Sequence, residues 1–216
     1  MQEQSHGLMG TDLELCLDFT DVVDWRNNDS RRADGLASYA ELLDWSRKRG
    51  ILSREEAASL DKDTSKEEGE KVVAHAVRLR EAIYRIFSAV AHGSKAALAD
   101  LDILNEYLAR GFSRVRVSEE GRNYEWDWDD KISPDMMLYP IASSAAGLLT
   151  SSDLARVREC ANEEEGCGSL FLDCSKSQTR RWCSMKSCGN RMKFRAYYER
   201  HNHPKSDALR AHARAS

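Results

Sequence analysis

The chain of 216 residues can form one large domain, or a medium-sized domain followed by a small unit that needs extra stabilisation. Hydrophobic residues make up 41% of it and charged residues 31%, which is typical of a water-soluble globular protein and excludes wholesale disorder. The net charge of -4 hides an asymmetry, because residues 174–216 hold 11 Lys and Arg residues against Glu199 and Asp207, giving +9 there and -13 elsewhere. We therefore expect a polyanionic partner for the carboxyl-terminal end only.

We expect neither a membrane span nor an export signal. The longest apolar stretch, residues 139–149, is too short to cross a bilayer and contains Ser143 and Ser144. The amino terminus lacks a basic region followed by an apolar core. These features favour a cytoplasmic protein without a membrane partner.

The first elements in chain order are an apolar segment and a helix. Residues 13–23 fit either a short strand or an irregular buried segment, and the pattern does not decide between them. Residues 34–48 are predicted to be helical, with Asp34 as the amino-terminal cap and Gly50 closing the other end. The side chains expected to face inward from this helix are Leu36, Tyr39, Ala40, Leu43 and Trp45.

Two capping-box patterns, Ser53 with Glu56 and Ser65 with Glu68, predict the starts of the next two helices. The second opens the strongest helical pattern in the chain, which Gly93 ends. Its inward face comprises Val72, Ala76, Leu79, Ile83, Phe87 and Val90, and its other faces are expected to carry Lys71, Arg78, Arg80, Glu81 and Arg85. A further helix is predicted over residues 95–110, stopped by Gly111.

The pattern then changes from helical to alternating. Residues 115–117 and 124–128 predict a β-hairpin, and we expect Trp126 and Trp128 to pack on the helical domain. Two short helices, or one bent helix, follow over residues 141–149 and 152–160, with Ser152 or Asp153 as the second cap. We place a domain boundary near residue 150.

Five of the six cysteines are crowded into the last third of the chain, which favours metal binding over disulfides. Two pairs stand out, separated by fifteen residues and flanked by glycines that permit tight turns. We predict that a structural Zn²⁺ is bound by Cys160, Cys167, Cys183 and Cys188. Four thiolates leave no coordination position for water, which disfavours catalysis. Cys174 is an alternative to Cys160, and Cys16 is expected in the core.

A small hairpin and a helix are expected around this metal. Leu170 and Leu172 are predicted to lie on one strand and Arg181 and Trp182 on the other. A helix should begin at residue 190, with aromatic side chains anchoring it to the hairpin: Phe194 and Tyr197 or Tyr198. A unit this small depends on its metal for folding.

The exposed cations of this end are candidates for phosphate contacts. The predicted nucleic-acid-binding residues are Arg180, Arg181, Lys186, Arg191, Lys193 and Arg195. The plainer interpretation is that these charges keep a terminal helix soluble. In the other domain, Trp25 and Arg26 lie among acids and amides and are candidates for a ligand site, or simply part of a capped turn.

Residues 182–191, Trp-Cys-Ser-Met-Lys-Ser-Cys-Gly-Asn-Arg, follow Phe171-Leu172-Asp173 and a cysteine pair, and this arrangement resembles the CGNR zinc-finger family. Residues 15–19 and 139–149 are similar to the ABATE domain that accompanies this finger. The resemblance implies a stress-linked bacterial transcription regulator with a DNA-binding zinc module. The six residues between Cys160 and Cys167 are more than the family's usual spacing, so Cys160 is the least settled ligand.

Together these patterns predict a mainly α-helical domain with a β-hairpin (an α+β fold) and a separate small zinc module of treble-clef or zinc-ribbon type. The predicted parts are a sensor or dimerisation domain over 1–150, the zinc module over 151–204 and a basic, mobile tail over 205–216. The expected function is zinc-dependent DNA or RNA binding in transcription regulation. A protein-interaction adaptor, or a small-molecule-binding domain or enzyme with a structural zinc, is the alternative. A homodimer and a small-molecule effector stay open.

Overall fold

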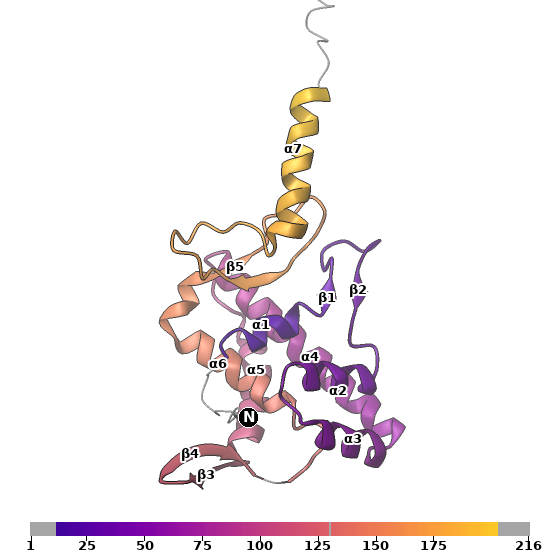
Figure 1. Ribbon diagram of the computed structural model, residues 1–216, viewed down its shortest axis with the longest axis vertical. Helices are drawn as coiled ribbons and strands as arrows, with labels where there is room; N and C mark the ends of the chain where they lie inside the picture. The colour runs from indigo at the N-terminus through magenta and orange to yellow at the C-terminus, as the bar shows by residue number, and fades with distance from the viewer. Residues whose placement is uncertain (1–11, 130, 203–216) are drawn as a thin grey trace, which may run out of the picture.

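The computed structural model describes residues 12–129 and 131–202, so the predicted tail lies outside the described residues. It confirms the α+β class (Figure 1). The helices are α1 (Leu15–Thr20), α2 (Tyr39–Lys48), α3 (Arg54–Asp63), α4 (Lys66–Ala91), α5 (Leu98–Phe112), α6 (Leu138–Thr150) and α7 (Asn190–Asn202), with short turns η1 (Ser152–Arg156) and η2 (Met185–Gly189). The strands form three antiparallel pairs, β1 (Val23–Asp24) with β2 (Ala33–Asp34), β3 (Val115–Glu120) with β4 (Asn123–Trp128), and β5 (Val157–Glu159) with β6 (Leu170–Leu172).

Helix α4 runs through the middle of the helical body, against α1, α2, α5 and α6 (Figure 1). Its predicted inward face is buried from Val72 to Phe87, as helical spacing of apolar residues requires. Residues 13–23, which fitted a strand or an irregular segment, instead contain α1, and its apolar side chains enter the same core: Leu15, Cys16, Leu17 and Phe19. The described part of the chain contains no helix long and apolar enough to cross a membrane.

The predicted caps of α3 and α4 are confirmed. Ser53 accepts from the Glu56 amide at 3.1 Å while the Glu56 carboxylate accepts from the Ser53 amide at 2.7 Å. Ser65 likewise accepts from the Glu68 amide. The predicted cap of α2 was wrong, because Ser38 fills that position and Asp34 lies on β2.

Asp34 instead pairs with Arg80, which was predicted on an outer face of α4 but is buried. The two guanidinium nitrogens of Arg80 lie 2.7 and 2.8 Å from the Asp34 carboxylate oxygens. Arg80 also donates to Glu81, and Arg26 donates to Glu81 at 2.6 Å. Burial raises the pKa of Asp34, but the Arg80 hydrogen bonds outweigh it and leave that pKa below its ordinary value. A charged cluster therefore fastens the β1–β2 segment to α4.

Helix α5 begins at Leu98 and continues past Gly111, so Gly111 does not stop it as predicted. A Cβ atom at Gly111 would lie 3.2 Å from the Cβ of Tyr139. The glycine is therefore required by the close approach of α5 to α6 and not by a helix end.

The β3–β4 hairpin is confirmed, with Val117 opposite Trp126 and a turn at Gly121. Its expected packing on the helical domain is wrong for most of its apolar face. Val117, Tyr124 and Trp126 are 58%, 74% and 51% exposed, whereas Trp128 packs on Tyr139 with ring centroids 6.1 Å apart. The hairpin therefore projects from the body, and its tip extends beyond the end of the helices (Figure 1).

The second short helix predicted over residues 152–160 is only partly helical. Ser151, and not Ser152 or Asp153, caps the turn η1. The chain then forms β5, which pairs with β6. Val157 on β5 and Leu170 and Leu172 on β6 all enter the core that the helices form. The strands that lead to the cysteines are thus built on the helical body.

Candidate metal centre

The first two metal-ligand candidates lie on the segment that connects β5 to β6. The predicted pairing of residues 170–172 with residues 181–182 is wrong, because β6 pairs with β5. Cys160 follows β5, and its amide donates to the Ser169 carbonyl at 2.8 Å. Residue 181 still approaches this edge, since its carbonyl accepts from the Ala161 amide at 2.8 Å.

Cys167 sits in a tight turn between two glycines with left-handed backbone angles, Gly166 with φ of 71° and Gly168 with φ of 68°. The Cys167 amide donates to the Asn162 carbonyl at 3.1 Å, which folds the intervening residues back on themselves. Cys160 and Cys167 therefore lie close together despite the six residues between them.

Cys183 and Cys188 reach the same place from the other side. Cys188 lies on the turn η2, which runs directly into α7. Ser184 caps η2 by accepting from the Ser187 amide, and the Gly189 amide donates to the Ser184 carbonyl at 2.9 Å. The last cysteine is thus attached to the first turn of α7.

The four sulfur atoms form a compact group, all lying within 4.8 Å of one another. The Sγ atom of Cys183 is 3.7 Å from that of Cys167 and 3.8 Å from that of Cys188. A tetrahedral zinc ion with Zn–S bonds of about 2.3 Å separates its sulfurs by roughly 3.8 Å. The donor set and its spacing therefore fit Zn²⁺, and four thiolates make a closed, structural site.

The thiols strongly influence one another. Hydrogen bonds directed at the sulfur from Cys167 and Cys183 lower the pKa of Cys160 to about 4. Hydrogen bonds between Cys183 and the Cys160 and Cys167 sulfurs raise the pKa of Cys183 because they favour its protonated form, and burial and the neighbouring negative charges raise it further. A divalent cation would let all four ionise.

Backbone and amide donors complete the surroundings of the sulfurs. The Cys183 amide lies 3.5 Å from the Cys160 sulfur, and the Asn162 side-chain nitrogen lies 3.4 Å from the Cys188 sulfur. Cys160, Cys167 and Cys188 are buried. Such donors stabilise thiolates and orient them towards a metal.

The other two cysteines lie elsewhere. Cys174, the alternative to Cys160, is exposed and outside the four-sulfur group, with its sulfur 3.6 Å from a Glu14 carboxylate oxygen, so that alternative is wrong. Cys16 is in the core as predicted, where burial raises its pKa to about 12.

All six predicted nucleic-acid-binding side chains are exposed, but they differ in their partners. Arg191 pairs with Glu165 at 3.2 Å, and Arg195 pairs with Glu164 and Glu199. Arg180 lies over the Phe171 ring and donates to the Trp182 carbonyl, while Arg181 lies over the Trp182 ring. Among the residues that the structure describes, Lys186 and Lys193 have neither an ion-pair partner nor a ring contact.

The amino-terminal domain forms hydrogen bonds with the turn that contains Cys167, a contact that the sequence did not reveal. The Arg26 and Asn27 amides donate to the Cys167 and Gly166 carbonyls at 3.1 and 3.0 Å. The Asn28 side chain donates to the Glu165 carbonyl at 2.9 Å. The sequence signal for this contact was the polar segment of residues 26–28. It could not identify the contact because its partners lie more than a hundred residues away in the chain.

Glu165 connects this contact to α7. Its carboxylate accepts from Arg31 at 3.1 Å and from Arg191 at 3.2 Å, and both guanidinium groups lie over the Trp25 ring. Although burial raises it, these hydrogen bonds leave the pKa of Glu165 below its ordinary value. The base of α7 is thus tied to the amino-terminal domain.

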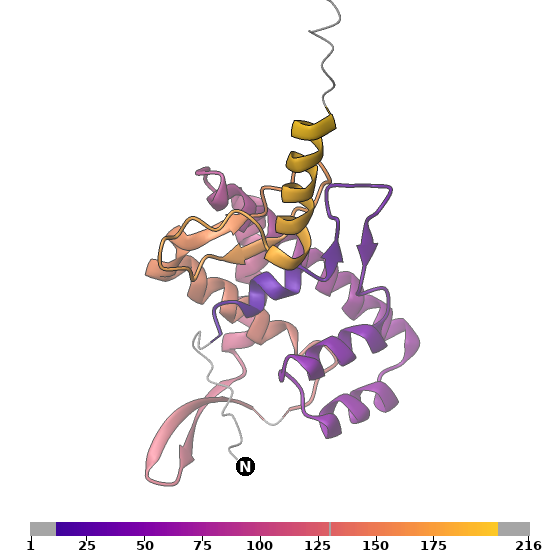
Figure 2. The same cartoon turned by 45° about the horizontal axis from the view of Figure 1, so that its top comes forward.

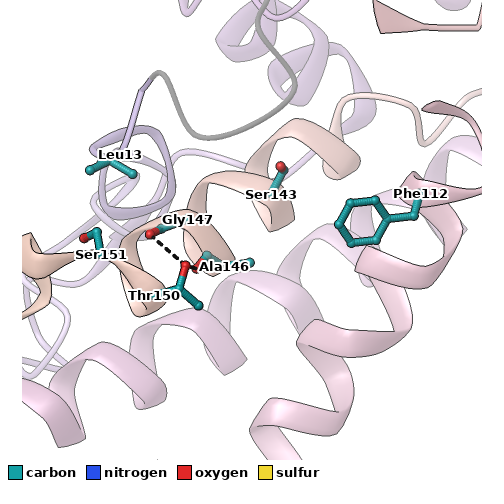
Figure 3. Close-up of a pocket in the computed structure, with 7 residues that line it drawn as sticks. All are labelled: Leu13, Phe112, Ser143, Ala146, Gly147, Thr150 and Ser151. Carbon is teal, nitrogen blue, oxygen red and sulfur yellow. Dashed lines mark hydrogen bonds between the residues drawn. The ribbon is translucent and has the colours of Figure 1, made fainter. Parts of the chain in front are cut away.

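Trp25 and Arg26, the candidate ligand-binding residues, are occupied by these structural contacts. Arg26 donates to Glu81 and to the Thr20 carbonyl and lies 4.1 Å from the Tyr84 ring centre. A separate groove of about 520 Å³ runs along α6, flanked by Leu13 and Phe112 (Figure 3). The described residues of its lining include no charged side chain and neither Trp25 nor Arg26.

Comparison with known proteins gives two family matches. Residues 13–152 match the ABATE family, described as "putative stress-induced transcription regulator". Residues 156–201, which contain all four clustered cysteines, match the CGNR zinc finger. A search of curated proteins finds no match.

Proposed function

The chain belongs to the ABATE family and carries a CGNR zinc finger, and from this premise we propose that it is a zinc-dependent DNA-binding regulator of transcription. The observation that supports the proposal best is the group of four sulfurs at the base of an exposed basic helix. In this proposal one Zn²⁺ is held by Cys160, Cys167, Cys183 and Cys188. Neither family description names a reaction.

The metal's role would be to hold α7 in place. Apart from the half-buried Met192, the side chains of residues 190–201 are exposed, so α7 gains little from core packing. A helix of 13 residues is marginal in water without such packing. Zinc would join Cys188, at the base of α7, to Cys160 and Cys167, which strands β5 and β6 fix to the body.

The free cations would supply most of the affinity for the DNA backbone. Lys186 and Lys193 can each replace a counterion on a phosphate, whereas Arg191 and Arg195 must first leave their carboxylate partners. The acidic remainder of the chain would keep DNA at the finger and away from the body. We assign sensing or dimerisation to residues 1–150. Their hydrogen bonds to the Cys167 turn physically connect this domain to the zinc finger.

The test is fluorescence anisotropy with labelled duplex DNA selected from a random pool, using the zinc-loaded full chain. We expect binding to weaken as salt rises, to vanish on zinc chelation and to return when zinc is added. Replacing both Lys186 and Lys193 with alanine should lower the salt slope by about one unit for each lysine.

The matched control replaces Lys66 and Lys71, two exposed lysines on α4, with alanine, and this variant should bind as the wild type does. Binding that persists in the metal-free protein, or that is indifferent to salt, would show the proposal to be wrong.

A further inference from the structure

One face of α7 carries a row of exposed rings, which we call the aromatic stripe: Phe194, Tyr197, Tyr198 and His201. The spacing of three, four and seven residues places them on the same side of the helix. Phe194, Tyr197 and Tyr198 are 63%, 53% and 46% exposed. The predicted anchoring of Phe194 and Tyr197 or Tyr198 to the hairpin expected around residues 170–182 is therefore wrong.

The rings contact one another instead of a core. Phe194 and Tyr198 have centroids 4.5 Å apart, and Tyr197 stacks on His201 at 4.0 Å. Helix α7 projects from the body in both views (Figure 1, Figure 2). The stripe is consequently an exposed surface of aromatic rings, in which one face of Tyr197 is covered by His201.

Positive charges border the stripe on both edges. Lys193 and Arg200 are four residues before and three after Tyr197, while Arg191 is three residues before Phe194. Helix α7 holds four Lys and Arg residues against the single acid Glu199. Two such helices would repel each other, which disfavours a second copy of this chain as the occupant. The charge favours a polyanion, and the rings favour a polyanion that has aromatic rings of its own.

Nucleic acid is the partner with both properties, but a regular duplex shows only base edges in its grooves, since base faces are covered by their neighbours. Unpaired bases present their faces and stack on protein aromatic rings. We propose that the aromatic stripe stacks unpaired nucleobases of a single-stranded or locally opened nucleic acid, with Lys193 and Arg200 contacting the adjacent phosphates. The inference rests on the proposed function and specifies which form of nucleic acid the finger prefers.

The test compares three labelled ligands by anisotropy with the zinc-loaded full chain: a mixed-sequence single strand, the same strand in a blunt duplex, and a duplex with an unpaired bulge. We expect the single strand and the bulge to bind about tenfold more tightly than the blunt duplex, because each stacked base adds to affinity. DNA and RNA versions of the single strand identify the natural source of the bases.

Two double variants separate ring stacking from general apolar contact. Replacing Tyr197 and Tyr198 with leucine should weaken single-strand binding about tenfold or more, with little effect on the blunt duplex. Replacing both with phenylalanine keeps the ring faces and should retain wild-type affinity. The control Tyr124→Leu removes an exposed tyrosine on the distant β3–β4 hairpin and should change nothing.

Wild-type binding by the leucine variant, or equal loss in the phenylalanine variant, would overturn the inference. A change of oligomeric state by sedimentation in the leucine variant, without a change in binding, would assign the stripe to a second copy and also overturn it. If the blunt duplex binds well and the leucine variant is unaffected, the stripe fails while the proposed function stands. If no nucleic acid binds the zinc-loaded protein, both fail.

Discussion

Gly166 shows how single residues hold the first cysteine turn. It has a left-handed backbone angle, and a Cβ atom there would lie 2.5 Å from the Asn27 carbonyl oxygen. Gly50 has the same φ of 71° but open space around it. Comparing alanine substitutions at the two glycines therefore separates the stability cost of the backbone angle from the stability cost of losing the contact with Asn27.

We expect Gly50→Ala to lower the free energy of unfolding by about 1 kcal/mol, the ordinary penalty for a left-handed alanine. Gly166→Ala should cost about 3 kcal/mol or more, since it also pushes the turn away from Asn27. Urea denaturation of the zinc-loaded proteins measures both. Equal costs for the two substitutions would contradict the assigned role of the turn.

Asp21 makes stability depend on pH near neutrality. Its carboxylate accepts from the Leu170 amide, and burial raises its pKa to about 7, far above the ordinary value of 3.8. A raised pKa means that the folded state favours the protonated form. This contribution is fully present below about pH 3.8 and is lost as the pH rises from there through 7.

From pH 6 to pH 8, ionisation of Asp21 should lower the free energy of unfolding by about 1.4 kcal/mol. Asp21→Asn keeps the acceptor oxygen and removes the titration, so its stability should be flatter over this range. Denaturation of both proteins at saturating zinc provides the comparison. An identical pH dependence of the two would exclude Asp21 as the source.

At the scale of elements, the β3–β4 hairpin is attached through one of its two tryptophans. Trp128 packs on Tyr139 and lies against Gly111, while Trp126 is 51% exposed. We expect Trp128→Ala to cost about 2 kcal/mol and Trp126→Ala less than about 1 kcal/mol, because only the first leaves a gap in packing. Thermal unfolding followed by circular dichroism measures both variants. An equal or larger loss of stability in Trp126→Ala would contradict the attachment of the hairpin through Trp128.

The finger should respond to loss of its metal in two distinct parts. Val157, Leu170 and Leu172 belong to the main core, so β5 and β6 should keep their amide protection in a chelator. Residues 183–202, which depend on the cysteine group, should lose theirs. Hydrogen exchange followed by mass spectrometry resolves the two segments, and uniform loss across the chain would contradict this division.

The elements that the sequence revealed were those determined by local patterns. The α4 face from Val72 to Phe87 and the Ser53–Glu56 box depend on neighbours within one or two turns, and both are as predicted. Strand β5 was missed because three residues carry too little periodicity, and its partner β6 lies beyond a cysteine turn. Asp34 looked like a helix cap because nothing local indicates its pairing with Arg80.

The same distinction applies to the site. The spacing and flanking glycines of the cysteines pointed to the four that cluster, since ligands from one segment must reach one ion. The acids opposite α7, Glu164 and Glu165, were not anticipated because their pairing with Arg195 and Arg191 depends on how the Cys167 turn folds. The exposure of the aromatic stripe depends equally on where α7 points, which no local pattern specifies.

At the scale of the whole molecule, the chain consists of an acidic helical body with a basic helix projecting from one end (Figure 1). Among the described residues, the two meet where the Cys167 turn, the segment from Trp25 to Arg31 and the base of α7 come together. In our account, a metal ion at that junction determines whether α7 has a fixed direction, and hence whether its cations and rings act together on a nucleic acid.

The proposed function depends on one zinc ion bound by four thiolates at this junction, and X-ray absorption at the zinc edge tests this binding most directly. For the purified full chain we predict one zinc per molecule with four sulfur neighbours at about 2.3 Å and no nitrogen or oxygen in the first shell. A first shell with two or more nitrogen or oxygen ligands, or a chain that stays folded and binds no zinc, would contradict the account.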